Sequence, residues 1–214
     1  MIEALADRGV RAVAFDMPGC GADPTPRNQA NLAMQVDRVV DHIDATPDGE
    51  IRLVGHSIGG WVLAPAAAAR PDRVKELAFV GGAVLGRSER GIDITPTHRQ
   101  AGYYALAASS PDNSLMVSFE DAHARFFNHL DERAARRAYA RLTPQPFQPY
   151  LDAALVGIED VSVARRYIAM ADDRTYPAAV TELFAAKADV AREVIPADHC
   201  VMLSAPDLLA ATLG

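Results

Sequence analysis

A short serine segment flanked by glycines, residues 55–60 (GHSIGG), is the most specific chemical signal in the chain. A β-rich run precedes it and an apolar helical stretch follows, which is the strand–turn–helix setting of a nucleophile elbow. On such a turn the Ser57 hydroxyl would project above the strand ends, and side chains at positions 55 and 59 would collide with neighbouring backbone. The backbone N–H of Ile58 would face the oxyanion of a tetrahedral intermediate. The pattern favours nucleophilic catalysis over an ordinary turn with a solvent-facing serine.

A serine hydroxyl becomes a good nucleophile only when a base takes its proton, so a histidine must lie near Ser57. The chain has six histidines, and His199 alone follows directly on a predicted strand, residues 192–195. The carboxyl ends of parallel strands converge at one edge of a sheet. We therefore expect His199 to reach Ser57.

An acid that orients the histidine should also follow a strand end, between the serine and the histidine in the chain. Asp172 and Asp173 both come just after the predicted strand at residues 167–170, and Asp160 is a more distant candidate. The chain order serine, acid, histidine is the nucleophile–acid–base order expected with an elbow of this kind. The residues alone leave the choice between the two neighbouring aspartates open.

Strand-like and helix-like stretches alternate along most of the chain, which predicts a mostly parallel sheet with helices on both faces. Pro65 falls inside one predicted helix and should bend it locally. The predicted strands are residues 10–15, 51–54, 74–80, 167–170 and 192–195, and the predicted helices are residues 2–8, 32–43, 58–69, 177–187 and 208–213.

Residues 86–150 interrupt this alternation, and we call them the insert. They are more polar, helical in character, and hold 8 of the 14 aromatic residues. These rings could form a small core of their own, line an apolar pocket over the sheet, or do both. We expect residues 1–85 and 151–214 to form an α/β core and the insert to be a helical cap.

Composition limits the class of protein. Of 214 residues, 50% are hydrophobic and 23% charged, and 21 basic against 28 acidic residues give a net charge of −7. This is the profile of a globular domain with a sizeable core, without the basic surface that nucleic-acid binding or membrane attachment needs. Two cysteines are too few for a disulfide framework, and no export signal is evident. We expect a soluble, cytoplasmic protein.

Five further blocks, together with the elbow, resemble the α/β-hydrolase superfamily, in the branch that holds plant methylesterases, hydroxynitrile lyases and bacterial carboxylesterases. The resemblance implies a serine nucleophile at 57 and a general base at His199. The residues themselves show no zinc-ligand spacing and no dinucleotide fingerprint, so we expect no metal and no cofactor. In relatives the acid stands four residues before a proline, so Pro177 selects Asp173. The matching blocks are residues 16–21 (DMPGCG), 54–60 (VGHSIGG), 126–129 (FFNH), 141–146 (RLTPQP), 167–177 (YIAMADDRTYP) and 197–203 (ADHCVML).

The residue after the histidine separates activities within this branch. Hydroxynitrile lyases that resemble this chain carry a lysine there to hold the charge of cyanide, whereas this chain has the neutral Cys200. Epoxide hydrolases and haloalkane dehalogenases share the fold but use an aspartate nucleophile, which Ser57 excludes. The expected function is a carboxylesterase that forms an acyl-enzyme on small to medium, apolar or aromatic esters. We expect Trp61, Phe126, Phe127 and Cys200 to contact the substrate.

Relatives also carry an upstream strand that ends in a histidine–glycine turn and supplies a second oxyanion N–H. No His-Gly pair occurs before residue 50. We therefore expect 20–30 residues to be absent at the amino end, as judged from the resemblance. The alternatives are a non-catalytic small-molecule binding protein, and a lactone or thioester hydrolase of a biosynthetic pathway. The oligomeric state is open.

Overall fold

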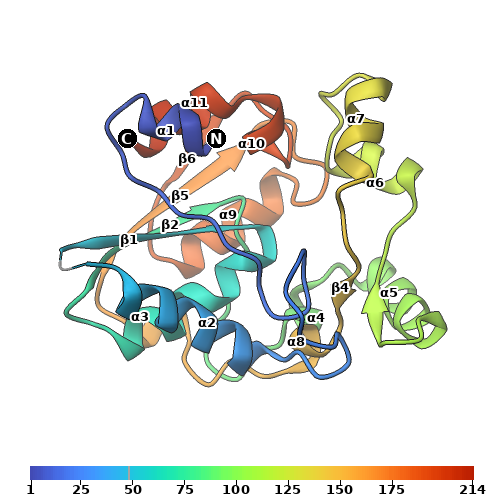
Figure 1. The fold of residues 1–214 in the computed structure, drawn as a ribbon, viewed down its shortest axis with the longest axis horizontal. Coiled ribbons are helices and arrows are strands. Elements are labelled where there is room, and N and C mark those ends of the chain that lie inside the picture. The colour runs from blue at the N-terminus through green and yellow to red at the C-terminus, as the bar shows by residue number, and fades with distance from the viewer. Residues whose placement is uncertain (48) are drawn as a thin grey trace.

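A four-stranded parallel sheet forms the centre of the computed structural model, which describes residues 1–47 and 49–214. All neighbouring strands pair in parallel, so their carboxyl ends point to the same edge (Figure 1). This arrangement confirms the predicted fold class. In the order β1-β2-β5-β6, the strands are β1 (Ile51–His56), β2 (Val74–Val80), β5 (Ala164–Met170) and β6 (Arg192–Ile195).

Four of the five predicted strands are confirmed. The boundaries of β2 and β6 are as predicted, while β1 continues two residues further and β5 begins three residues earlier. The start of β5 escapes prediction because it is charged rather than apolar. Arg165, which lies there, donates hydrogen bonds to the backbone oxygens of Ala188 and Ile158.

The prediction of a strand at residues 10–15 is wrong. This segment is extended but belongs to no strand, and no described segment pairs with β1 on the side away from β2. A β-rich sequence becomes a strand only when a neighbour accepts and donates its backbone hydrogen bonds. Here Val10 and Ala12 pack against helices at the chain termini, and Val13 is 71% exposed.

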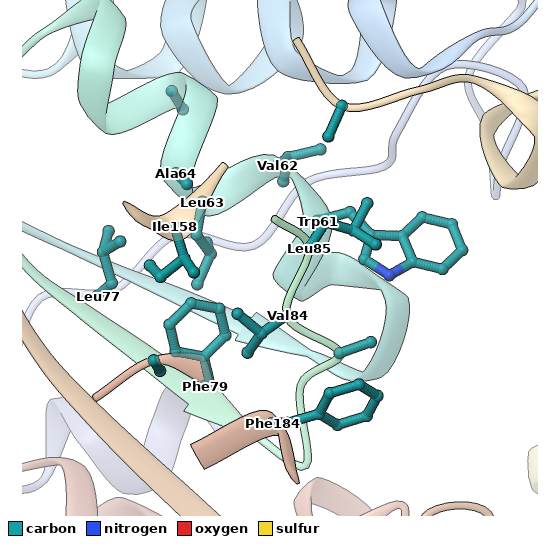
Figure 2. Packing of buried hydrophobic residues seen from close by; sticks show 14 of the residues in the cluster. Trp61, Val62, Leu63, Ala64, Leu77, Phe79, Val84, Leu85, Ile158 and Phe184 are labelled. Atoms are coloured by element: carbon teal, nitrogen blue, oxygen red, sulfur yellow. The ribbon is translucent and has the colours of Figure 1, made fainter. Parts of the chain in front are cut away.

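The two faces of the sheet are covered by different helices, because alternate residues of each strand point to opposite faces. Leu77 and Phe79 of β2 face one cluster, with Trp61, Val62 and Leu63 from the segment after Ser57 (Figure 2). Ala78 and Val80 face the other. The first cluster holds α2 (Leu32–Ala45), α3 (Leu63–Ala69) and α9 (Ala178–Lys187), and the second holds α1 (Ile2–Ala6), α10 (Val201–Ser204) and α11 (Pro206–Leu213).

The predicted helix at residues 58–69 is divided. A 3-10 helix, η1 (Ser57–Val62), leads into α3. Pro65 is the third residue of α3, in the first turn, where a backbone N–H has no intrahelical partner. The proline therefore marks the change of helix type without interrupting α3.

The insert lies at the carboxyl-end edge of the sheet (Figure 1). Part of it has a small core of its own, in which Phe127 packs with Ala122 and Ala135. None of the helices in the described ranges has the length and apolar character to cross a membrane. Between β2 and β5 the chain forms α4 (Gly91–Ile94), α5 (Thr97–Ser109), β3 (Ser114–Leu115), α6 (Phe119–Arg125), α7 (Glu132–Tyr139), β4 (Gln145–Pro146), α8 (Gln148–Leu151) and η2 (Ile158–Asp160).

Candidate active site

Ser57 lies on the sharp turn between β1 and η1. Its φ of 53° is in the left-handed region that residues other than glycine rarely adopt, at a cost of about 1–3 kcal/mol. The segment after β2 holds this turn in place, because Ala83 N donates a hydrogen bond of 2.9 Å to the Ser57 carbonyl oxygen. The strained conformation is that of a nucleophile elbow.

Close approach of backbone oxygens requires glycine at two of the three positions around Ser57. A Cβ atom at Gly55 would lie 2.6 Å from the Gly59 carbonyl oxygen, and one at Gly60 would lie 2.3 Å from the Ala83 carbonyl oxygen. At Gly59 a Cβ would meet no atom within 4 Å, so the prediction of a collision at this position is wrong. The helix that follows Ser57 approaches the backbone after β2 at Gly60, one residue later than expected.

Three polar side chains from three strand ends meet at this turn. His199 Nε2 is 3.0 Å from Ser57 Oγ, and His199 Nδ1 is 2.8 Å from Asp173 Oδ2. His199 is 2% exposed and Asp173 5% exposed. The serine can pass its proton to Nε2 only if Nδ1 carries the other ring proton, and a carboxylate acceptor at Nδ1 favours that tautomer.

Asp173 is oriented by the turn that follows it. Its Oδ1 accepts hydrogen bonds from the backbone N–H groups of Thr175, at 2.7 Å, and Tyr176, at 2.8 Å. Its Oδ2 is then left for the histidine. Asp172 points away from Ser57, and its half-exposed carboxylate lies 3.1 Å from His129 Nε2. Of the two aspartates after β5, only Asp173 contacts His199.

His199 is positioned through both its backbone and its ring. His56 Nε2 donates a hydrogen bond of 2.8 Å to the His199 carbonyl oxygen, and the two rings lie 4.7 Å apart. Burial is the main cause, and the neighbouring His199 the next, of a His56 pKa that is lowered from its usual value to about 3. A neutral His56 adds no repulsive charge when His199 becomes protonated.

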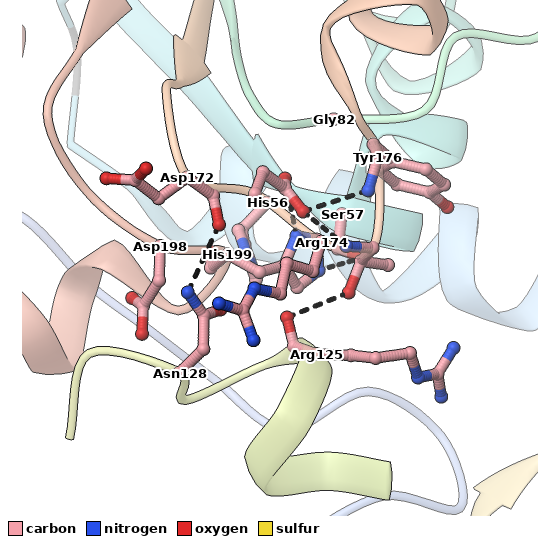
Figure 3. Close-up of polar contacts among 12 residues, drawn as sticks. His56, Ser57, Gly82, Arg125, Asn128, Asp172, Arg174, Tyr176, Asp198 and His199 are labelled. Atoms are coloured by element: carbon pink, nitrogen blue, oxygen red, sulfur yellow. Dashed lines mark hydrogen bonds and ion pairs between the residues drawn. The ribbon is translucent and has the colours of Figure 1, made fainter. Parts of the chain in front are cut away.

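The insert is bound directly to the loops that carry the acid and the base. Asp198 is fully buried, and its carboxylate accepts from His129 N, at 2.9 Å, and from Ser204 Oγ, at 2.6 Å. Cys200 N donates to the Phe126 carbonyl oxygen at 3.0 Å. Asn128 of the insert donates a hydrogen bond of 3.2 Å to the Asp172 carbonyl oxygen (Figure 3), and the Arg125 carbonyl oxygen accepts one of 3.3 Å from the Thr175 hydroxyl. Residues 125–129 thus connect the insert to the loops after β5 and β6, and we call this segment the bracket.

The four residues expected to contact substrate occupy different places. The Phe126 ring lies 5.7 Å from the His199 ring, and Cys200 lies in the apolar cluster beside it, where burial raises the pKa of the Cys200 thiol to about 12. Phe127 points instead into the core of the insert. Trp61 is 2% exposed, packs edge-on against Tyr150 at 4.8 Å, and leaves its buried Nε1 without a partner among the described residues.

Ile58 borders a cavity of about 250 Å³ whose lining residues include neither Ser57 nor His199. The buried Gln35 and the insert residue Gln145 also line it. A second, more polar cavity of about 360 Å³ lies beside Asp172 and Arg174. The first cavity is the one that reaches the residue predicted to supply the oxyanion N–H.

Tyr176 was not singled out by sequence reasoning. It lies at the same strand end as Asp173, and its ring packs edge-on against the His199 ring at 5.7 Å. The available signal was its position three residues after the acid, within the block that carries the resemblance.

Comparison with known proteins places this geometry in a family. The model of the family described as "Alpha/beta hydrolase family" matches residues 1–212. The chain therefore belongs to the α/β hydrolase family.

Two putative chloroplastic methylesterases of Arabidopsis thaliana resemble nearly the whole chain. Methylesterase 14 is 25% identical over 232 residues and methylesterase 12 is 22% identical over 223 residues, which cover 98% and 97% of this chain. The chain spans 64% of the length of each of these relatives. The likeness to methylesterases that the sequence blocks indicated is thus confirmed.

Solved structures share the fold. An extracellular α/β-hydrolase from a Paenibacillus species has a TM-score of 0.91 at 20% identity and covers 99% of this chain and 89% of its own. A pyrethroid hydrolase from Sphingobium faniae JZ-2 has a TM-score of 0.82 at 22% identity and covers 99% and 88%.

Proposed function

We propose that the chain is a serine hydrolase that cleaves carboxylic esters through an acyl-enzyme. The observation that carries this proposal is the chain of contacts from Ser57 Oγ to His199 and from His199 to Asp173, at 3.0 and 2.8 Å. The strained φ of Ser57 supports it, because strain of this kind persists at sites where function needs it.

In the first half of the reaction, Ser57 Oγ attacks the ester carbonyl while His199 Nε2 takes the serine proton. The Ile58 N–H donates to the resulting oxyanion. The bond between the acyl carbon and the alkoxy oxygen then breaks, and the alcohol leaves with the proton from His199. Asp173 stabilises the imidazolium without taking a proton.

In the second half, water attacks the acyl-enzyme and gives its proton to His199 Nε2. The bond from the acyl carbon to Ser57 Oγ breaks, and the proton on His199 returns to Oγ. The products are the acid and the free enzyme.

We propose that the insert is the cap of this active site and that the substrate is an apolar or aromatic ester of small to medium size. Phe126 beside His199 and the aromatic group of Trp61, Tyr150 and Tyr103 support an apolar environment. The relatives named methylesterases are consistent with a small alcohol group. The same geometry can serve a lactone or a thioester, because the attacked carbonyl is similar.

Hydrolysis of a panel of p-nitrophenyl and methyl esters, measured for the chain and for Ser57→Ala, tests the proposal. We expect turnover that Ser57→Ala abolishes and that falls as the acyl chain becomes charged. Saturable binding of esters without turnover, unaffected by Ser57→Ala, would support the non-catalytic binding protein instead.

A further inference from the structure

The cavity of about 250 Å³ beside the elbow has no part in the mechanism above. Ile58 and Gly59, the two residues that follow Ser57, both line it. Gly59 has no side chain, and a Cβ atom placed there would meet no atom within 4 Å. The volume is slightly below the usual range of about 300–1,000 Å³ for small-molecule pockets. The cavity therefore has room for a short chain next to the nucleophile turn.

Two glutamine side chains line this cavity. Gln35 of α2 is 6% exposed, and no hydrogen bond joins its carboxamide to another of the described residues. Gln145 of β4 lies on the cavity wall as well. Buried polar groups in native proteins nearly always have a hydrogen-bond partner, so a molecule inside the cavity must supply one to Gln35. This molecule is either water or part of a substrate.

The thiol of Cys20 fixes the orientation of the Gln145 carboxamide. Cys20 Sγ donates a hydrogen bond of 3.5 Å to Gln145 Oε1. Burial raises the pKa of Cys20 to about 11, so the thiol keeps the proton that it donates. Because Oε1 is engaged by the thiol, Gln145 offers its Nε2 donors to the cavity. Gln35 can both donate and accept.

The rest of the lining selects against a charged ligand. Phe15, Met17 and Val62 are apolar. Among the described residues on the cavity wall, Asp16 alone is charged, and its carboxylate would repel an anion. The group that suits two carboxamides in apolar surroundings is an uncharged one that both donates and accepts hydrogen bonds. A hydroxyl has this property.

The position of the cavity relates it to the acyl part of an ester. The leaving alcohol takes its proton from His199, so the alcohol must lie beside that ring. His199 does not line the cavity, whereas Ile58, which is expected to donate to the oxyanion, does. The acyl chain is therefore the part of the substrate that can extend past Ile58.

We propose that this cavity is an acyl subsite for a short chain that carries a hydroxyl group, and that Gln35 and Gln145 bind this hydroxyl. The proposal rests on the esterase function proposed above and narrows the substrate class to esters of short hydroxy acids. Gln35 Oε1 accepts the hydroxyl proton, and Gln145 Nε2 donates to the hydroxyl oxygen. The carbon atoms of the chain contact Phe15, Met17 and Val62.

The p-nitrophenyl esters of 3-hydroxybutyrate and butyrate test the proposal, because they differ only in the hydroxyl. Each kcat/KM is divided by the rate of hydroxide-catalysed hydrolysis of the same ester, which removes the difference in intrinsic reactivity. We expect the parent chain to favour the hydroxylated ester by about fivefold. Gln35→Leu should abolish this preference by lowering the value for the 3-hydroxybutyrate ester. Both esters are measured on one sample, so a smaller folded fraction leaves the ratio unchanged.

Gln145→Leu is a second variant that should lower the same ratio, and Gln148→Leu is the matched control. Gln148 is also a half-buried glutamine of the insert, but its Nε2 donates a 2.7 Å hydrogen bond to Asp152 Oδ1 and it does not line the cavity. We expect the ratio of Gln148→Leu to equal that of the parent.

Two results would overturn the proposal. Equal corrected values for the two esters in the parent would mean that the cavity holds only water. A preference that persists in both Gln35→Leu and Gln145→Leu would mean that the hydroxyl is bound elsewhere. A parent chain that hydrolyses neither ester is a different result, because it contradicts the esterase function itself and is recognised without any variant.

Discussion

The two flanks of Ser57 are built very differently. On the flank of β5 and β6, Asp173, Asp198 and Tyr176 are buried and hydrogen-bonded, and the bracket at residues 125–129 holds the insert against them. On the β1 flank, no described strand pairs with the outer edge of β1, and Val54 within β1 is 48% exposed. A cavity of about 250 Å³ lies there beside Ile58.

The difference separates two parts of the proposed chemistry. Proton transfer depends on the β5–β6 flank, where each reacting group has at least two fixed contacts. Oxyanion stabilisation depends on the β1 flank, where Ile58 borders a cavity. We therefore expect substitutions on the β5–β6 flank to reduce the catalytic rate strongly. Substitutions on the β1 flank should reduce activity mainly where they distort the backbone turn at Ser57.

The largest effect should come from Asp173→Asn on the β5–β6 flank. The amide favours the wrong tautomer of His199, so kcat/KM for an aryl acetate should fall by about 10⁴-fold. Asp172→Asn is the matched control, because this neighbouring carboxylate contacts His129 rather than His199. Similar losses in the two variants would contradict the assignment of Asp173 as the acid.

Gly55→Ala and Gly59→Ala should differ in stability and activity, and the difference would test the description of the β1 flank. The first places a Cβ 2.6 Å from a backbone oxygen and should cost about 1–3 kcal/mol of unfolding free energy, with loss of activity. The second meets no atom within 4 Å and should be close to the parent. Urea unfolding and ester hydrolysis measure both, and an inactive Gly59→Ala would show that the elbow is tighter than described.

Asp198→Ala should weaken the attachment of the bracket to the loop that carries His199. The β5–β6 flank would then be less firmly hydrogen-bonded, as the β1 flank already is. It leaves His129 N and the Ser204 hydroxyl without their buried acceptor, which should cost roughly 1–3 kcal/mol of unfolding free energy. The KM for ester hydrolysis should rise along with this loss of stability. Asp37→Ala on the exposed face of α2 is the control, and an equal change in both variants would argue against the bracket.

The smallest effect should be a change in pH dependence at His56. Its pKa of about 3 in the folded chain lies below its usual value of 6.5, so the unfolded chain binds a proton between these values and the folded chain does not. This contribution to stability is complete above pH 6.5 and is lost as the pH falls toward 3.

His56→Asn should therefore reduce the dependence of unfolding free energy on pH by roughly 1 kcal/mol per pH unit between pH 6 and 4. The expected slope is below the full value for one proton because the residue keeps some exposure. The slopes can be compared by urea unfolding at several pH values. Equal slopes in parent and variant would show that His56 is protonated as easily in the folded chain as in the unfolded one.

The sequence determined much of the β5–β6 flank and less of the β1 flank. Ser57 and His199 could be predicted because each follows a recognisable strand, and parallel strands bring their carboxyl ends together. The choice of Asp173 over Asp172 needed the spacing to Pro177 known from relatives, because both residues follow β5. The strand predicted at residues 10–15 failed because pairing depends on a neighbour rather than on local composition.

Side-chain direction in irregular segments was beyond the sequence. Phe126 and Phe127 are adjacent and chemically identical, yet one faces His199 and the other the core of the insert. Their segment ends α6 without a regular periodicity that would assign the faces. Tyr176 was missed for a related reason, since the contact of its ring with the His199 ring depends on how the turn after Asp173 folds.

Labelling with a fluorophosphonate, followed by peptide mapping, tests the central claim most directly. The account predicts one covalent adduct on Ser57 in the parent chain, none in Ser57→Ala, and a strongly reduced rate in His199→Ala. An exposed histidine of α5, replaced in His98→Asn, should leave the rate unchanged. A parent chain that stays unlabelled, or one labelled at another residue, would contradict the assignment of Ser57 as an activated nucleophile.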